Sequence, residues 1–267
     1  MDIVKPVIVT ALFDIDRPNW KNYKSSYHTY IQWSRNLLSI DCPLVIFTEE
    51  KFFKDLFDIR KEYDPKMSQT KSIVNDKESL MLYHSHYKKI KELMESEPFA
   101  NRVQFPDVPE MCQPWYNIIM MSKLNLMKET YVHQYIPNDL VIWKDIAVYR
   151  DKPERYENVK WPDVDKINRT KPTFFSHHEK VSIHDNKSHI LSQMRFVQGG
   201  SFAIPGYLLQ PVEKAYMNLV DNYLSLGYVG SDEKYLDLLV KENPDKFELI
   251  KCDWREYFPF FEYEVAQ

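Results

Sequence analysis

The amino-acid sequence predicts an α/β fold in which helices flank a Rossmann-like, mostly parallel central sheet. Residues 7–13 and 43–48 are short apolar runs of the kind that strands buried on both faces require. Between them, over 27–38, apolar residues recur with helical spacing, which completes a strand-helix-strand unit. A chain of 267 residues can bury one sizeable core, so a single domain over 1–267 is expected.

The later elements continue this alternation. Residues 51–95 are charged and lack glycine, and one helix over about 77–94 is predicted there. A long helix is predicted from about 114 to 134, and a strand over 139–145 follows it directly. The remaining predicted elements are strands at 173–175, 196–197 and 247–250, and helices over 212–226 and 232–240.

Composition and charge exclude several classes of protein. Hydrophobic residues make up 44% and charged residues 28%, which is ordinary globular usage and disfavours a disordered chain. No transmembrane segment and no secretory signal are recognised, and the three cysteines are far apart, so a cytoplasmic location is expected. The formal net charge of −4 removes the global attraction that most nucleic-acid binders show.

Motifs of the common nucleophile and phosphate-loop enzymes do not occur. The sequence has no G-x-S-x-G, no G-x-x-x-x-G-K-[ST] and no G-x-G-x-x-G. Four histidines lie close together, but their spacing matches no structural zinc site, so histidines in a solvated loop are the better interpretation. These histidines are His177, His178, His184 and His189.

Polar residues follow two predicted strands at the edge where open α/β sheets bind ligands. The first strand runs into Asp14, Asp16 and Arg17, and the strand over 139–145 ends in Asp145. A carboxylate at a strand tip is the usual way to hold Mg²⁺ or Mn²⁺ against a nucleotide diphosphate. Arg17 would instead contact the phosphates directly.

Three further charged residues are candidates for the same crevice. Lys123 lies on the helix before the strand that ends in Asp145, although spacing alone favours a solvated surface lysine. Asp232 and Glu233 open a predicted helix, where acidic side chains complement the helix dipole. A carboxylate at that point, next to the stretch over 199–230 that holds all five glycines, is also well placed to act as general base.

Taken in order, these motifs resemble those of the HtrL/YibB family of bacterial and viral glycosyltransferase-like proteins. The resemblance spans nearly the whole chain, and it implies a single GT-A-like domain. Residues 1–150 would form the nucleotide-sugar-binding half, and residues 151–267 the acceptor-side half. The motifs that carry it lie at 9–17, 121–123, 142–145, 198–202 and 232–233.

The resemblance also implies roles for individual residues. Asp145 would hold Mn²⁺ or Mg²⁺ on the diphosphate in a cleft between the first two strands, and Asp232 would be the base. Lys144, in the middle of the W-x-D motif, is a departure from the family pattern, and a lysine there would partly neutralise the diphosphate itself. The residues expected on the donor side are Thr10, Ala11, Arg17, Ser122, Lys123 and Trp143, and those on the sugar and acceptor side are Gln198, Gly199, Gly200 and Glu233.

The predicted function is therefore that of a glycosyltransferase that moves a sugar from a nucleotide-diphosphate sugar to a hydroxyl acceptor. A glycan or lipopolysaccharide is the acceptor by family default, and a hydroxymethylated base of viral DNA, flipped out of the duplex, stays open. The negative net charge argues mildly against DNA. The alternative is a non-catalytic sugar- or nucleotide-binding protein with the same fold. It is motivated by the sequence after Asp145, where Ile146 and Ala147 stand in place of the small residue and glycine of the family pattern.

Overall fold

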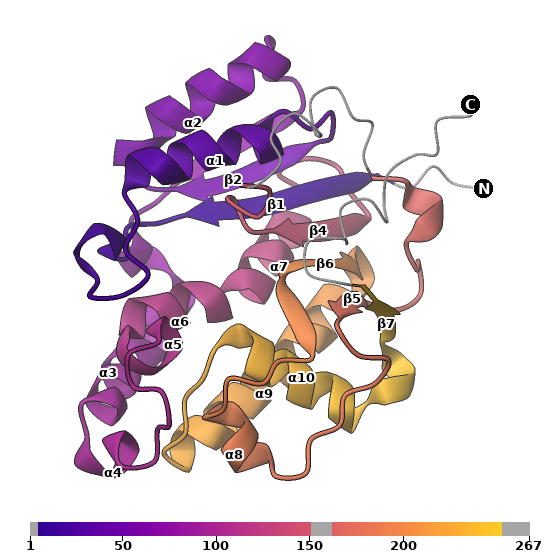
Figure 1. The fold of residues 1–267 in the computed structure, drawn as a ribbon. Coiled ribbons are helices and arrows are strands. Elements are labelled where there is room, and N and C mark those ends of the chain that lie inside the picture. The colour runs from indigo at the N-terminus through magenta and orange to yellow at the C-terminus, as the bar shows by residue number, and fades with distance from the viewer. Residues whose placement is uncertain (1–4, 151–161, 253–267) are drawn as a thin grey trace.

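One sheet runs through the computed structural model, which describes residues 5–150 and 162–252. Its seven strands lie in the order β3-β2-β1-β4-β6-β5-β7, and helices cover both faces (Figure 1). β6 is antiparallel to its neighbours β4 and β5, and all other neighbours are parallel, so the predicted α/β class with a mostly parallel sheet is confirmed. The strands are β1 (Pro6–Leu12), β2 (Leu44–Thr48), β3 (Thr70–Val74), β4 (Leu140–Lys144), β5 (Thr173–Ser176), β6 (Val197–Pro205) and β7 (Glu248–Lys251).

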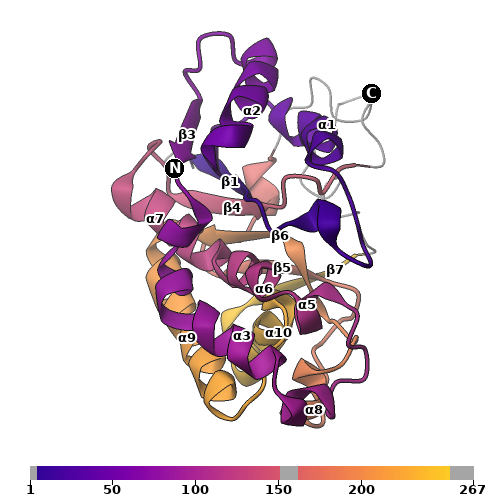
Figure 2. The same cartoon turned by 90° about the vertical axis from the view of Figure 1, so that its left-hand side faces the viewer.

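Helices form a layer on each side of the sheet. α1 and α2 cover one face, and α6, α7, α9 and α10 cover the other, as Figure 1 and the rotated view in Figure 2 both show. No helix in the described part of the chain is long and apolar enough to span a membrane. The helices are α1 (Tyr27–Leu38), α2 (Glu50–Tyr63), α3 (Lys88–Met94), α4 (Glu97–Ala100), α5 (Pro109–Cys112), α6 (Pro114–Met121), α7 (Lys123–His133), α8 (Asn186–Ile190), α9 (Leu209–Ser225) and α10 (Asp232–Glu242).

Alternating side chains of β1 supply both halves of the core. Val7 and Val9 pack into the cluster under α6, α7, α9 and α10, whereas Ile8 packs into the cluster under α1 and α2. All three side chains are fully buried or nearly so. A strand buried on both faces needs apolar residues at successive positions, which is why the sequence over 7–13 reveals this strand so clearly.

The long helix predicted over 114–134 is two helices. α6 ends at Met121 and α7 begins at Lys123, with Ser122 between them. The Ser122 hydroxyl donates a hydrogen bond to the Ile118 carbonyl at 2.7 Å, a back-bond that commonly bends helices. The break makes Lys123 the first residue of α7, beside β4.

Sequence patterns located the elements of residues 51–95 least well. α2 and β3 were not predicted, and the helix expected over 77–94 is a short 3₁₀ turn, a π-helical segment at Tyr83–Tyr87 and α3. β3 lies at the edge of the sheet with none of its side chains fully buried, so it lacks the continuous apolar run of an inner strand.

The order of the strands places a crevice between β1 and β4. From β1 the chain proceeds outward to β2 and β3, and it then returns to pair β4 with the opposite side of β1. Val9 of β1 lies opposite Trp143 of β4 in this parallel pair. After β1 the chain continues toward one edge of the sheet, and after β4 it continues toward the other edge. The gap between two such strands is called a switch point, and ligands of open α/β sheets bind there, beyond the carboxyl ends of the strands.

Candidate active site

A pocket with a volume of about 260 Å³ opens at this switch point. Its lining includes Ala11 to Phe13 at the end of β1, Trp143 on β4, and Asp145 to Val148 beyond the end of β4. No residue of β2 lines it, so the expected cleft between the first two strands is corrected to one between β1 and β4. The order of the strands explains this position. The chain continues toward the same edge of the sheet after β1 and after β2, so no crevice opens between these two strands, whereas it continues toward opposite edges after β1 and after β4.

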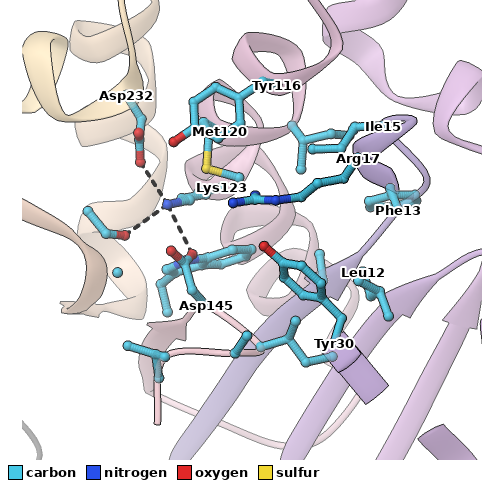
Figure 3. A pocket seen from close by; sticks show the side chains of 18 of the residues that line it. Leu12, Phe13, Ile15, Arg17, Tyr30, Tyr116, Met120, Lys123, Asp145 and Asp232 are labelled. Carbon is cyan, nitrogen blue, oxygen red and sulfur yellow. Dashed lines mark hydrogen bonds and ion pairs between the residues drawn. The ribbon is translucent and has the colours of Figure 1, made fainter. Parts of the chain in front are cut away.

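Lys123 is the centre of the polar network in this pocket (Figure 3). Its Nζ lies 3.0 Å from Asp145 Oδ1 and 2.8 Å from Asp232 Oδ2, and it donates a hydrogen bond to the Gly199 carbonyl at 2.9 Å. The side chain is only 3% exposed. Although burial lowers it, the two carboxylates hold the pKa of Lys123 above its usual value.

Asp145 is the most accessible member of this network. Its Oδ1 accepts a hydrogen bond from Trp143 Nε1 at 2.7 Å in addition to its contact with Lys123. The main-chain N–H of Asp145 donates to the Gly200 carbonyl at 2.9 Å, which fixes the strand tip against β6. The side chain is 37% exposed, and its Oδ2 accepts no hydrogen bond from the described residues, so this oxygen faces the pocket with acceptor capacity left.

Asp232 and Glu233 approach the network from the start of α10. Burial raises the pKa of Asp232 in spite of the nearby Lys123 ammonium. Gly199 lies directly against both acids, because a Cβ at this position would stand 2.6 Å from Asp232 Oδ2 and 2.9 Å from Glu233 Cγ. Only a glycine allows the main chain to approach these carboxylates so closely.

Glu233 belongs to a second chain of charges. Its Oε1 accepts the Gly199 N–H at 3.1 Å, and its Oε2 lies 3.0 Å from Arg195 Nε. Arg195 Nη2 in turn donates to Glu110 Oε1 at 2.6 Å. Burial raises the pKa of Glu233 to about 7, although Arg195 acts to lower it.

The opposite wall of the pocket is built from rings and one guanidinium. The carbon Cζ of Arg17 lies 4.9 Å from the Trp20 ring centroid and 5.1 Å from that of Tyr30. Arg17 Nε donates to the Tyr23 carbonyl at 3.3 Å, and Arg17 makes no ion pair with any described carboxylate. Figure 3 shows this guanidinium pointing into the pocket toward Lys123, with the Tyr30 hydroxyl close to Asp145.

Asp14 and Asp16, expected as strand-end carboxylates, hold the loop after β1 and do not line the pocket. Asp14 forms an ion pair with Lys51 and accepts a hydrogen bond from the Tyr27 hydroxyl. Burial acts to raise the pKa of Asp14, but these hydrogen bonds lower it to about 2. Asp16 adopts a left-handed conformation with φ of 61° and accepts a hydrogen bond from Asn19 Nδ2 at 2.7 Å.

Of the residues expected on the donor and acceptor sides, most line the pocket, whereas Thr10, Ser122 and Gln198 do not. Thr10 is fully buried within β1, and the Ser122 hydroxyl is used by the helix break. Gln198 is buried and donates from Nε2 to the Cys252 carbonyl at 3.3 Å. The expected residues that line the pocket are Ala11, Arg17, Lys123, Trp143, Asp145, Gly199, Gly200, Asp232 and Glu233.

Lys144 does not face the pocket, which corrects its expected role beside the diphosphate. It is fully buried, and its Nζ lies 5.1 Å from the Tyr149 ring centroid on the side of the sheet opposite Trp143. Alternation along β4 sends adjacent side chains to opposite faces. Burial holds the pKa of Lys144 well below its usual value.

The histidines are not gathered in a metal site within the described residues. His177, His178 and His184 are exposed, as the sequence suggested. His189 is buried instead, and its Nε2 lies 2.9 Å from Asp237 Oδ2. Asp237 also accepts the main-chain N–H groups of Phe196 and Val197, so this pair secures the start of β6.

Sequence analysis missed the ring and guanidinium groups that complete the pocket. Tyr30 lies on α1 and Tyr116 on α6, and Arg195 lies in the segment before β6. No motif or spacing marks them. The aromatic fraction of 15% was the one available signal, and it does not identify positions.

The side chains around Asp145 do not fit the expected Mn²⁺ or Mg²⁺ ion. A divalent cation held by both Asp145 and Asp232 would lie between these two carboxylates. The Lys123 ammonium already lies there. Within the described residues, no group of three or more His, Cys, Asp or Glu side chains is placed to hold a metal ion. Asp145 Oδ1 already accepts two donors, so among the described residues one oxygen of one carboxylate is left for a metal here.

Comparison with known proteins places the chain in a family and finds distant structural likenesses. The family model described as "Bacterial protein of unknown function (HtrL_YibB)" matches residues 5–263. A search of curated proteins found no match.

Solved structures with a partial likeness include three proteins. Apo mouse xyloside xylosyltransferase 1 matches at 11% identity and a TM-score of 0.44, over 95% of this chain and 91% of that chain. The glycosyltransferase GlyE of Streptococcus pneumoniae TIGR4 matches at 11% identity and a TM-score of 0.41, over 93% of this chain and 46% of that chain. The nucleoside-diphosphate-sugar pyrophosphorylase of Vibrio cholerae RC9 matches at 9% identity and a TM-score of 0.40, over 91% of each chain.

Proposed function

The chain belongs to the HtrL_YibB family, and from that premise we propose that it transfers a glycosyl group from a nucleoside-diphosphate sugar to a hydroxyl acceptor. The observation that carries this proposal is the convergence of Asp145, Lys123 and Asp232 in a pocket at the switch point between β1 and β4. Aromatic rings and the Arg17 guanidinium line the same pocket. Rings suit a nucleoside, and a guanidinium suits a phosphate.

In the proposed reaction the bond between the anomeric carbon and the β-phosphate oxygen breaks, and the acceptor oxygen forms a bond to that carbon. The nucleoside diphosphate leaves with the bonding electron pair, so negative charge grows on its β-phosphate. We assign Arg17 to this charge, because no described carboxylate pairs with its guanidinium and preorganised charges stabilise a leaving group most strongly in a confined site. Lys123 holds Asp145 and Asp232 in place with its three N–H groups. Asp145 orients the Lys123 ammonium and presents its Oδ2 to the sugar.

The acceptor proton needs a base on the side of the pocket formed by α10. Asp232, the residue expected from the sequence, directs its Oδ2 to Lys123 and is only 5% exposed. Glu233 is more accessible, with 19% of its side chain exposed, and its pKa of about 7 suits proton transfer near neutral pH. We therefore assign the base to Glu233 and assign Asp232 to the positioning of Lys123.

The acceptor is proposed as a carbohydrate hydroxyl, with the hydroxymethylated base of DNA as the second candidate. Carboxylates and carbonyls on the α10 side, around Glu233 and Gly199, are hydrogen-bond acceptors that suit sugar hydroxyls. Duplex DNA would bring many phosphates to a chain of net charge −4. Retention on duplex DNA that weakens as salt rises, without retention on neutral glycans, would favour the DNA acceptor.

A non-catalytic binding protein is the second candidate function. One observation favours it, because the single Lys123 ammonium engages both Asp145 and Asp232 and so reduces the charge that each can offer a reaction. Such a protein would bind a nucleotide or sugar in the same pocket and leave the donor intact.

Incubation of the full chain with sugars linked to uridine, guanosine, cytidine and thymidine diphosphate separates these functions. A transferase without acceptor hydrolyses its donor slowly, so we expect release of one nucleoside diphosphate, measured by chromatography. Binding of a donor without release would support the non-catalytic alternative. A folded protein that neither binds nor cleaves any of these donors would contradict the proposal.

A further inference from the structure

We propose that this chain binds the diphosphate of its donor without a divalent cation, because the Lys123 ammonium fills the position of that cation and the Arg17 guanidinium contacts the phosphates. This inference rests on the proposed function and specifies how the same pocket recognises its ligand. It follows from the disagreement between the metal site expected at Asp145 and the side chains that surround that residue.

The position of Lys123 carries the first step. Its Nζ is fixed by three oxygens, those of Asp145, Asp232 and the Gly199 carbonyl, at 2.8 to 3.0 Å. Such a set of oxygens around one cationic centre resembles a metal's ligand set, but the cation belongs to the chain. A dication on Asp145 would stand close to this ammonium, and two like charges in a partly buried site repel strongly. The chain therefore already fills the place of the ion.

Arg17 carries the second step, because its charge is available to a ligand. It makes no ion pair within the described residues, whereas the charges on Lys123 and Arg195 are matched by carboxylates. The rings of Trp20 and Tyr30 lie against its guanidinium, and the Tyr23 carbonyl accepts a hydrogen bond from its Nε. Its terminal nitrogens point into the pocket (Figure 3). A guanidinium held in this way can bind two phosphate oxygens at once.

The charge balance of the pocket agrees with recognition of a diphosphate by side chains. Arg17, Lys123, Arg150 and Arg195 line it, against the carboxylates Asp145, Asp232 and Glu233. Asp145 and Asp232 surround Lys123, and Glu233 and Glu110 flank Arg195, whereas Arg17 keeps a charge that no described carboxylate matches. Burial also raises the pKa values of Asp232 and Glu233, so their negative charges are the easiest in the pocket to neutralise when a dianion enters.

Isothermal titration of the full chain with uridine, guanosine, cytidine and thymidine diphosphates tests the inference. Each nucleotide is titrated once in EDTA and once with Mn²⁺. For the nucleotide that binds, we expect dissociation constants in the two buffers that agree within about threefold. A larger gain in affinity with Mn²⁺ would overturn the inference and leave the proposed transferase standing. If none of the four binds in either buffer, the proposed function fails and this inference fails with it.

Two arginine variants identify the cation. Arg17→Gln should weaken binding in EDTA by about 10- to 100-fold, the usual loss for a hydrogen bond to a charged group. Arg102→Gln is the matched control, because Arg102 lies 4.5 Å from the Tyr228 ring centroid in a similar contact but outside the pocket. Unchanged affinity in Arg17→Gln would remove this residue from the diphosphate site and overturn the inference. Circular dichroism of both variants verifies that they are folded.

Discussion

The two walls of the pocket are built from opposite chemistry. The wall from the first part of the chain presents rings, Tyr27 and Tyr30 among them, and the guanidinium of Arg17, which has no carboxylate partner in the described residues. The wall from the last part presents Asp232 and Glu233, and both are already engaged by cations of the chain. The first wall is therefore suited to receive a ligand, whereas the second holds its charges in fixed pairs.

Lys123 lies between these two walls (Figure 3) and pairs with Asp232 of the second wall. It draws Asp232 of the last part and Asp145 at the strand tip to one ammonium. The chain must bury this lysine to do so, and burial of a cation is tolerated only with close partners. We therefore predict first the effect of substituting Lys123, and then the effects of substitutions in each wall.

Lys123→Met should have the largest effect on stability. It leaves Asp232, a carboxylate with only 5% of its side chain exposed, without its cation, and such losses typically cost about 3–5 kcal/mol. Urea unfolding monitored by tryptophan fluorescence would measure the change. Lys128→Met on the same helix is the control, because Lys128 pairs with a single carboxylate of the described residues, Glu213, and is 25% exposed, so its loss should cost less. Equal losses in the two variants would contradict the central position of Lys123.

Gly199→Ala should disturb the second wall alone. The new Cβ would stand 2.6 Å from Asp232 Oδ2, and overpacking of this kind costs about 1–3 kcal/mol. Ser201→Ala on the same strand is the control, since the buried Ser201 hydroxyl has no hydrogen-bond partner among the described residues and its removal should be nearly neutral. Thermal unfolding of the pair gives the difference, and no difference would mean that Gly199 and the acids of α10 do not meet closely.

The pH dependence of transfer tests the base on the second wall. Glu233 must be deprotonated to accept a proton, and its pKa is about 7, so the rate should rise with pH through neutrality and fall about tenfold per unit below it. Glu233→Gln should give a low rate without this rise. Glu242→Gln, at the exposed end of the same helix, should keep the wild-type profile. A wild-type rate that is flat over this range would exclude Glu233 as the base.

Tyr30→Ala should have the smallest effect and concerns the first wall. Removal of one ring that contacts a ligand weakens binding by about 2- to 12-fold, since aromatic contacts contribute roughly 0.5–1.5 kcal/mol. Nucleotide affinity measured by titration would show the loss, with Tyr23→Ala as the control because Tyr23 is 58% exposed and does not line the pocket. Equal affinities of Tyr30→Ala and the control would show that Tyr30 does not contact the nucleotide.

Sequence reasoning found the sheet and the strand-tip acid because both leave local signals. β1, β2 and β4 are buried on both faces and so appear as apolar runs, and Asp145 follows the last of these runs. The burial of Lys123 has no such signal, because it depends on carboxylates that are distant in sequence and on the helix break at Ser122. The sequence also does not show which face of the sheet carries the pocket. The side chain of Lys144 could therefore be placed on the opposite face only from the structure.

Asp145→Asn tests the central claim most directly, because it keeps the size of the side chain and removes the charge that orients Lys123. With the donor identified, release of nucleoside diphosphate should fall at least about 100-fold, a loss typical of a group that acts on the transition state. Asp165→Asn, an exposed acid outside the pocket, should release the product at the parental rate. If folded Asp145→Asn protein also worked at the parental rate, the strand-tip carboxylate would not belong to the mechanism, and the account would be contradicted.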